Sequence, residues 1–242
     1  MTDDIRRVMV VMAHPDDPEF GAGGTVAKWT QEGKEVVYVL VTSGDKGSSD
    51  PEMTSERLAR QREEEQRAAA RHLGVSQVVF LNYTDGEVVA DLQLRHDITR
   101  EIRRWRPDVV ISQNPTTYYV NGYINHPDHR AVGEAALAAV FPTARDHLNY
   151  PEHRAEGLKP HKVRQVYLCI SLDADTFVDI TDTMDVKIKA LWEHKSQFDD
   201  PEGLAERLRE RSAATARRAR EQGAEVGEYA EAFRLIDLSA RR

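Results

Sequence analysis

The 242-residue chain has a single cysteine, Cys169, and no long apolar run. One cysteine cannot form a disulfide within the chain, which favours a reducing compartment, so we expect a cytoplasmic protein. No apolar stretch approaches the roughly 20 residues that span a bilayer. The acidic start, residues 1–4, lacks the basic and apolar pattern of a signal peptide. The sequence therefore predicts no membrane partner and no disulfide framework.

Basic residues are fewer than acidic residues. The chain has 33 Lys and Arg against 41 Asp and Glu, a net charge of −8, which argues against nucleic acid as the main partner. Residues 204–220 are rich in arginine, but glutamates alternate with the arginines at helical spacing. This favours an ion-paired solvated or interface helix over a phosphate-binding patch.

Apolar runs alternate with helical segments through the first 140 residues. Four runs are expected to be buried strands: 7–12, 35–41, 78–81 and 109–112. Four segments are expected to be helices: 23–32, 55–73 (capped by Ser55), 92–105 and 129–140. This alternation predicts an α/β protein, a Rossmann-like three-layer sandwich with a mostly parallel sheet.

The last third is expected to add further strands and helices to this sheet. Strands are predicted at 163–170 and 177–180, and a helix at 184–197 capped by Asp182. A charged helix and a final apolar patch at 229–236 follow, while 114–125 and 142–161 are expected to be loops. We see no internal repeat and no low-complexity linker, so we expect one domain, residues 1–242.

Two polar clusters carry the chemistry. Ala13-His14-Pro15-Asp16-Asp17 directly follows the first strand, and His126-Pro127-Asp128-His129 follows the fourth strand and its loop. Ligands of open parallel sheets gather at the carboxyl ends of strands, where both clusters are expected. Imidazole and carboxylate donors without thiolate suit a catalytic zinc ion, which takes three protein ligands and acidifies a water to a pKa of about 7.

Two other interpretations need weighing. Either cluster alone fits a polar turn, with Pro and Asp chosen for backbone reasons, as well as it fits a functional site, but both together favour the functional site. The glycines of 21–24 invite a dinucleotide-binding interpretation, yet the third glycine of that fingerprint is Val26 here. We expect the glycines to let the backbone pass close to a metal and to start the helix.

The segment AHPDDPEFGAGGT (13–25), with HPDH at 126–129, resembles the LmbE-like, or PIG-L, zinc-dependent de-N-acetylases. Shorter segments support the resemblance: 42–45, 62–65, 73–74, 85–86 and 194–197. The resemblance implies a hydrolase that removes an N-acetyl group from an N-acetylglucosamine-type substrate. Its implied cofactor is one Zn²⁺ per chain, although imidazole and carboxylate ligands would also accept Fe²⁺.

The resemblance also implies residue roles. The implied zinc ligands are His14, Asp17 and His129. Asp16 would be the general base that takes a proton from the zinc-bound water and passes it to the departing amine.

The remaining implied roles concern the intermediate and the substrate. His126 would be a charged imidazole that stabilises the tetrahedral intermediate, with Asp128 tuning and orienting it. Arg62 would lie near the substrate, and Asp85 would contact sugar hydroxyls.

Two departures from the family pattern stand out. The family motif commonly reads His-Pro-Asp-Asp-Glu, whereas here Pro18 displaces the glutamate to Glu19, so its role is left open. Some members place a tyrosine two residues before the first histidine of HPDH. This chain has Ile124 there, with Tyr123 one residue earlier, and no tyrosine is assigned to the oxyanion.

Several alternatives stay open at this stage. The substrate could be a thiol S-conjugate cleaved by amide hydrolysis, or a natural-product intermediate. A non-catalytic metal-binding protein on the same scaffold should have lost the base, whereas Asp16 is present. The family resemblance suggests a homo-oligomer, either trimeric or hexameric.

Overall fold

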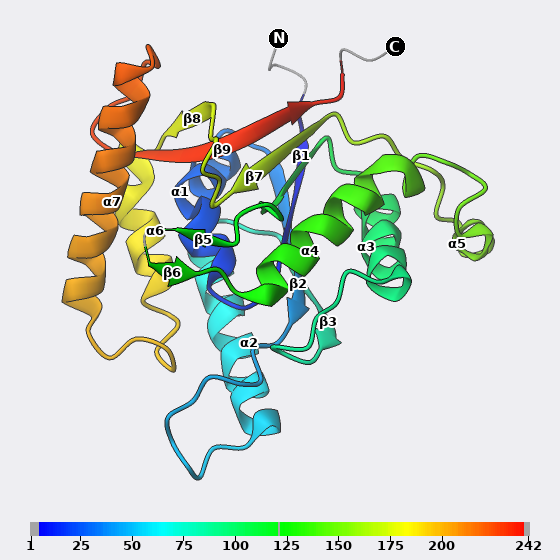
Figure 1. The fold of residues 1–242 in the computed structure, drawn as a ribbon, viewed down its shortest axis with the longest axis horizontal. Helices are drawn as coiled ribbons and strands as arrows, with labels where there is room; N and C mark the ends of the chain where they lie inside the picture. The colour runs from blue at the N-terminus through cyan, green and yellow to red at the C-terminus, as the bar shows by residue number, and fades with distance from the viewer. Residues whose placement is uncertain (1–4, 121, 240–242) are drawn as a thin grey trace.

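A seven-stranded sheet with helices on both faces forms the centre of the protein (Figure 1). The computed structural model describes residues 5–120 and 122–239, so the expectation for residues 1–4 lies outside the described residues. Across the sheet the strands are β3 (Gln77–Tyr83), β2 (Glu35–Thr42), β1 (Arg7–Met12), β4 (Val109–Gln113), β7 (Gln165–Cys169), β9 (Ala230–Asp237) and β8 (Thr176–Asp179).

The strand directions confirm the predicted sheet. Strands β3, β2, β1, β4 and β7 run parallel, whereas β9 runs antiparallel to both of its neighbours, β7 and β8. The α/β class and the mostly parallel sheet are therefore correct, and the C-terminal strands extend one side of it. β9 comes last in the sequence but lies inside the sheet.

The helices divide between the two faces according to the alternation of β1. Val8 and Val10 lie on one face of the sheet, which is covered by α1 (Asp17–Gln31), α2 (Ser55–His72) and α6 (Met184–Leu191). Met9 and Val11 lie on the other face of the sheet, which is covered by α3 (Leu92–Trp105) and α4 (Pro127–Ala138). Both faces of the strand are buried, which explains its unbroken apolar sequence.

Helix α1 begins earlier than predicted, at Asp17 instead of residue 23. The expectation that the glycines of 21–24 start this helix is therefore wrong, because they lie within it. A Cβ at Gly24 would lie 2.7 Å from Ile180, and one at Gly21 would lie 2.9 Å from the Cys169 sulfur. The glycines allow neighbouring elements to pack closely on the helix.

Other boundaries also differ from expectation. The cap of α2 is Thr54, whose hydroxyl accepts the Arg57 amide, instead of Ser55. The 184–197 helix ends at Leu191, and Asp182 lies before it in the short helix η2 (Thr181–Thr183) without capping it. The remaining elements are β5 (Tyr119–Val120), β6 (Tyr123–Ile124), η1 (Ala139–Thr143), α5 (Pro151–Ala155) and α7 (Pro201–Glu221).

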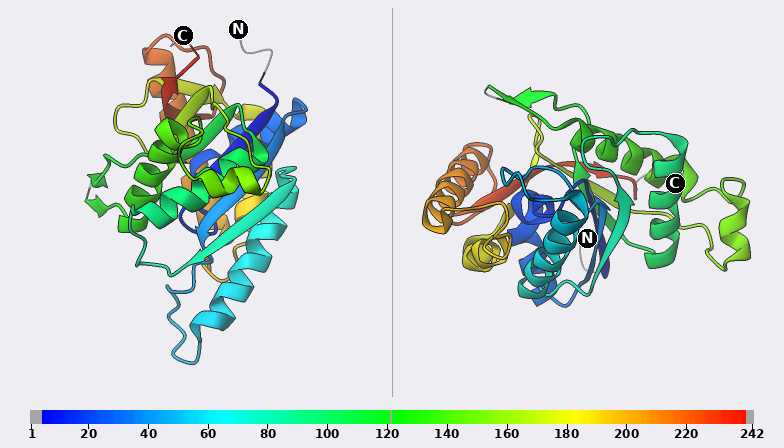
Figure 2. Two further views of the ribbon diagram at one scale, coloured as in Figure 1. Left: turned by 90° about the vertical axis from the view of Figure 1, so that its right-hand side faces the viewer. Right: turned by 90° about the horizontal axis from the view of Figure 1, so that it is seen from below.

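Two of these elements fall in segments that were predicted as loops. The β5–β6 hairpin projects away from the sheet in both views of Figure 2. Helix α5 lies in the 142–161 segment. Within the described ranges, no helix is both long enough and apolar enough to cross a membrane.

A buried ion pair connects three parts of the chain. Lys187 on α6 places its Nζ 2.6 Å from Glu231 Oε1 on β9, and both side chains are about 5% exposed or less. The Glu231 carboxylate accepts the backbone N–H groups of Gly24 and Thr25 in α1, at 2.9 and 2.8 Å. Lys187 also donates to the Phe20 carbonyl at 3.1 Å. The last strand therefore holds the helix that follows the first polar cluster.

Candidate metal centre

The two polar clusters meet at the carboxyl ends of β1 and β4. His14 follows β1 after one residue, and His126 caps the N-terminus of α4, with its Nδ1 accepting the Asp128 backbone N–H at 3.2 Å. The chain leaves β1 toward β2 on one side, and β4 lies on the other. This is the point where ligands bind in open α/β sheets.

His14, Asp17 and His129 form a set of converging donors. The Asp17 carboxylate lies between the two imidazoles, with Oδ2 3.2 Å from His14 Nδ1 and Oδ1 3.1 Å from His129 Nε2. One donor atom from each residue lies within 4.8 Å of the other two. Two imidazole nitrogens and one carboxylate match the protein ligands of many catalytic zinc sites.

The outer nitrogens of both histidines are held by other side chains. His129 Nδ1 lies 2.8 Å from Asn125 Oδ1, and the Asn125 amide donates to the Thr117 carbonyl at 2.7 Å. This arrangement places the proton on Nδ1 and leaves the Nε2 lone pair toward Asp17. His14 Nε2 lies 3.2 Å from Asp128 Oδ2, which leaves Nδ1 for the cluster. Such outer partners orient metal-binding histidines.

The electrostatics of the cluster favour a cation. Burial alone would lower the pKa of His14, but hydrogen bonds that its ring makes to Asp128, Asp17 and Asp85 raise it to about 12. Burial would raise the pKa of Asp17, but the His129 and His14 side chains hold it well below its usual range. The carboxylates therefore require positive charge between them, which a divalent cation would provide. The residues present fit a metal ion by both donor type and charge.

Asp16 lies next to this cluster in a strained backbone conformation. Its φ is 80° and its ψ is −28°, in the left-handed region that non-glycine residues rarely adopt. The Gln66 side chain accepts the Asp16 N–H at 2.9 Å, and Arg62 Nη2 lies 3.1 Å from Asp16 Oδ2. Burial raises the pKa of Asp16 to about 6, against the opposing charge of Arg62. This carboxyl is suited to exchanging protons near neutral pH.

Asp16 is held by a series of buried side chains that are linked by hydrogen bonds. Gln66 Nε2 donates to the Glu19 carboxylate at 3.0 Å, and His194 Nε2 lies 3.2 Å from Glu19 Oε2. Gln66, Glu19 and His194 are all fully buried. Burial alone would lower the pKa of His194, but the hydrogen bond and charge of Glu19 raise it. Glu19, the displaced glutamate, is therefore connected to Asp16 by the two hydrogen bonds of Gln66.

The two tentative substrate contacts are already engaged within the protein. Arg62 is 5% exposed, and besides Asp16 it donates to the Pro15 carbonyl at 2.9 Å. Asp85 Oδ1 lies 3.1 Å from His14 Nε2 and 3.9 Å from His126 Nε2. Both side chains line the cleft, but their closest partners are the residues of the site.

His126 is more exposed than the other members of the site. Burial and the neighbouring His14 lower its pKa, against the Asp128 charge. Because Nδ1 accepts the Asp128 N–H, a neutral His126 carries its proton on Nε2. The Asp128 carboxylate lies closer to His14, at 3.2 Å, than to His126 Nδ1, at 3.8 Å. Asp128 therefore chiefly orients His14, whereas the resemblance implied that it orients His126.

The cluster opens into a cleft of about 630 Å³. The cleft is lined on one side by the sequence-predicted residues His14, Asp16, Asp17, Arg62, Asp85, His126 and His129. Other lining residues include Tyr123 from β6 and Arg211 from α7. Ile124 is 80% exposed and does not line the cleft. The structure thus gathers seven of the eight predicted site residues around one cleft, with Asp128 buried behind them.

Sequence reasoning missed several functional candidates. Asn125 precedes the HPDH cluster directly, and an amide beside a metal-binding motif is a signal that could have found it. Gln66 follows Arg62 by one helical turn, so both face Asp16 from α2. Arg211 gave no such signal, because its place beside the cleft depends on how α7 packs.

The fold and site together define an α/β enzyme with a His/Asp cluster that could hold a metal ion at the carboxyl ends of its strands. The sequence profile of the family described as GlcNAc-PI de-N-acetylase (PIG-L) matches residues 9–140. The chain belongs to this family. The predicted resemblance is therefore confirmed.

Individual relatives extend over most of the chain. Diacetylchitobiose deacetylase of Thermococcus kodakarensis is 36% identical over 196 residues, which cover 81% of this chain and 72% of the relative. The solved structure of N,N'-diacetylchitobiose deacetylase from Pyrococcus horikoshii, in complex with an inhibitor, is 32% identical with a TM-score of 0.87. That match covers 97% of this chain and 85% of the other.

One similar structure has a different chemistry. The 4-carboxy-2-hydroxymuconate hydratase GalB from Pseudomonas putida is 26% identical with a TM-score of 0.77, and the match covers 96% of both chains. The fold alone therefore does not define the reaction, which depends on the residues of the site.

Proposed function

We propose that this protein is a metal-dependent deacetylase that hydrolyses the N-acetyl group of an N-acetylglucosamine derivative. The observation that carries the proposal is the convergence of His14, Asp17 and His129 beside the strained, proton-accepting Asp16. The similarity to two diacetylchitobiose deacetylases supports the substrate class. We further propose that residues 1–242 form a single domain.

The proposed metal ion is Zn²⁺, held by His14, Asp17 and His129. When bound, it would polarise the acetyl carbonyl and lower the pKa of a water to about 7. Fe²⁺ would suit the same imidazole and carboxylate ligands. Metal analysis of the purified protein distinguishes the two ions.

The protein's own residues then perform the proton transfers. Asp16 accepts a proton from the water as the water oxygen attacks the carbonyl carbon of the acetyl group. Arg62 holds the Asp16 carboxylate at 3.1 Å, so that the base stays directed at the cleft. Asp16 then gives the proton to the amide nitrogen, the C–N bond breaks, and acetate and the free amine leave.

His126 supplies a donor to the carbonyl oxygen as negative charge develops there. Its Nε2 carries a proton even in the neutral ring, so donation does not require the charged form. Removing one such donor typically costs about a hundredfold or more in rate, or roughly 3 kcal/mol. Asp128 and Asn125 hold the two metal-binding histidines in orientation.

Acetate release from a panel of N-acetylglucosamine glycosides tests the proposal, with and without a chelator. We expect Asp16→Asn to lower kcat by at least about a hundredfold, because the base is lost, while one metal ion per chain is retained. Asp182→Asn, an exposed position away from the cleft, is the matched control and should behave as wild type. Undiminished acetate release by Asp16→Asn, or none by the metal-loaded wild type across the panel, would contradict the proposal.

Three further expectations stay predictions: a homo-oligomer (trimer or hexamer), a cytoplasmic location, and the absence of nucleic-acid or membrane partners. Light scattering on the purified protein measures the first. The thiol S-conjugate amidase and natural-product deacetylase alternatives would use the same residues, so the same substrate panel, extended to those amides, distinguishes them.

A further inference from the structure

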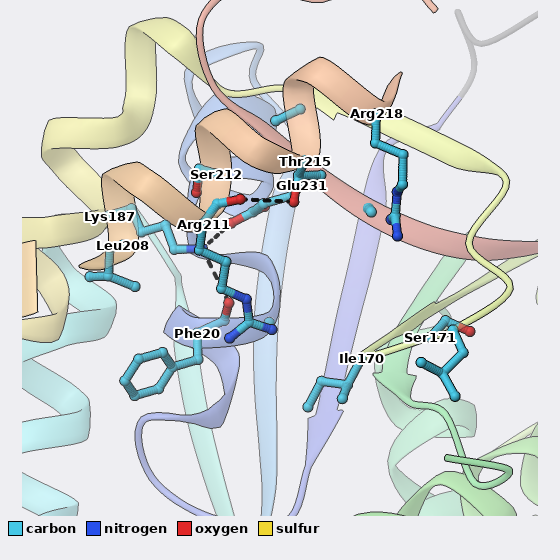
Figure 3. A pocket seen from close by; sticks show the side chains of 14 residues that line it. Phe20, Ile170, Ser171, Lys187, Leu208, Arg211, Ser212, Thr215, Arg218 and Glu231 are labelled. Atoms are coloured by element: carbon cyan, nitrogen blue, oxygen red, sulfur yellow. Dashed lines mark hydrogen bonds and ion pairs between the residues drawn. The ribbon is translucent and has the colours of Figure 1, made fainter. Parts of the chain in front are cut away.

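A second hollow adjoins the metal cleft at Phe20 and Ile170 (Figure 3). It has a volume of about 220 Å³ and lies between α7, β9 and the segment after β7. Phe20, Ile170 and Arg211 line both this hollow and the metal cleft. The hollow and the cleft therefore adjoin at these three side chains.

The lining of this hollow is basic and rich in hydroxyl groups. Arg211 and Arg218 enter from α7, two turns apart on one face, and Figure 3 shows Arg211 reaching toward Phe20 and Ile170. The hydroxyl groups come from Ser171, Ser212 and Thr215. The one carboxylate among the lining residues, Glu231, is 2.6 Å from Lys187 Nζ and is neutralised by it. The free charge of the hollow is therefore positive.

These two arginines differ from Arg207 and Arg209, which lie nearer the start of α7. Arg209 pairs with Asp185 at 2.7 Å, and Arg207 lies 3.8 Å from Asp200. Both partners lie outside α7, whereas the sequence predicted ion pairs with the glutamates interleaved on the same helix. In the described part of the chain, no carboxylate forms an ion pair with Arg211 or Arg218. Arg218 instead stacks on the Phe177 ring, with its guanidinium carbon 5.5 Å from the ring centroid.

Unpaired arginines beside a ligand cleft are notable in a chain of net charge −8. Acidic side chains are in excess, yet none neutralises this pair. Guanidinium groups bind carboxylates and phosphates through paired hydrogen bonds. The hollow is thus complementary to an anion.

We propose that Arg211 and Arg218 form a subsite for an anionic group, a carboxylate or a phosphate, on the part of the substrate attached to the amino sugar. The inference rests on the proposed function, because it assumes that the amino sugar occupies the metal cleft. It makes an acidic N-acetylglucosamine conjugate a better substrate than a neutral one. Arg211, which lines both spaces, is the specificity-determining residue.

Binding of three amino-sugar probes to the metal-loaded protein, measured by calorimetry, tests this subsite. The probes are glucosamine 1-phosphate, carboxymethyl glucosaminide and neutral methyl glucosaminide, none of which carries an acetyl group to be hydrolysed. We expect at least one anionic probe to bind about tenfold more tightly than the neutral one, since one charged hydrogen-bonded contact contributes about that factor. A preference limited to one of the two anions identifies which anion the substrate carries.

The variants separate this subsite from direct binding of the anion to the metal. Arg211→Ala should remove the preference for the anionic probes, while Arg211→Lys should retain part of it. Arg217→Ala, an exposed arginine on the same helix that lines neither space, is the control and should keep the full preference. Arg218→Ala should weaken the preference as well.

Equal affinity of the wild type for all three probes would overturn the inference, and so would a preference that survives in the Arg211→Ala/Arg218→Ala double variant. Neither outcome depends on turnover. Failure of the proposed function would instead appear as missing acetate release from neutral N-acetyl glycosides. The two failures are therefore distinguishable.

Discussion

Replacing Gln66 with leucine should slow catalysis without removing the metal. Gln66 accepts the Asp16 backbone N–H at 2.9 Å and donates to Glu19 at 3.0 Å, but it contacts none of the three metal-ligand candidates. Leucine has a similar size and no hydrogen-bonding group. The variant therefore removes the support of the base while leaving His14, Asp17 and His129 in place.

The magnitude follows from the backbone of Asp16. A left-handed conformation costs a non-glycine residue about 1–2 kcal/mol, which the surrounding structure must supply. The lost hydrogen bond contributes about 1–1.5 kcal/mol, close to the strain that it opposes. Without this hydrogen bond, the population of the catalytically productive Asp16 conformation should fall about tenfold, since 1.4 kcal/mol corresponds to a tenfold change in rate.

Stability should fall in the same variant. The buried Asp16 N–H loses its acceptor and the buried Glu19 carboxylate loses one donor, keeping the His194 contact. Together these losses should lower the free energy of unfolding by about 2–4 kcal/mol. Chemical denaturation measures this change, and the kinetic assay should be run under conditions where the variant is fully folded.

Acetate release gives kcat and KM for the variant, and elemental analysis gives its metal content. We expect kcat to fall about tenfold, with KM within about twofold and one metal ion per chain retained. Gln61→Leu is the matched control on the same helix, because Gln61 contacts Glu65 and does not line the cleft. An unchanged kcat in folded Gln66→Leu, or a loss of metal in proportion to activity, would refute the reasoning.

Two further predictions concern the supports of the site. Asn125→Ala removes the acceptor that orients His129, so metal affinity by competition with a chelator should fall about 10- to 100-fold, and unchanged affinity would contradict that role. Lys187→Met leaves the buried Glu231 carboxylate without its partner, so denaturation should show a loss of about 3–5 kcal/mol. The Lys187→Met/Glu231→Gln double variant should lose less than Lys187→Met alone, and an equal or larger loss would show that the isolated charge is not the cause.

The sequence was sufficient to predict the strands of the parallel sheet. A strand buried on both faces, such as β1, must be apolar at every position, and this signal is local. The start of α1 was placed six residues too late, because Pro18 and the preceding aspartates read as turn residues. Proline in the first turn of a helix is in fact favourable, since its missing N–H has no partner there.

The site was predictable where its chemistry is contained in a short segment. The two clusters contain the imidazole and carboxylate groups that bind metal ions. Both follow strands of a parallel sheet, and ligand-binding residues gather at the carboxyl ends of such strands. The support of Asp16 was not predictable, because Glu19 lies on α1, Gln66 on α2 and His194 after the end of α6, and the three meet only in the folded chain. For the same reason Arg211 was expected to belong to an ion-paired helix face, since the sequence does not show which arginines of α7 lack an acidic partner.

The interior position of β9 has a consequence for how the protein is made. During synthesis, the five parallel strands and β8 are complete before β9 is translated, and β8 has no partner in the sheet until β9 arrives. β7 exposes an unpaired edge over the same interval, and such edges promote association between nascent chains. The Glu231 carboxylate also reaches α1 only when β9 joins the sheet, so the helix that begins at Asp17 lacks this anchor until then.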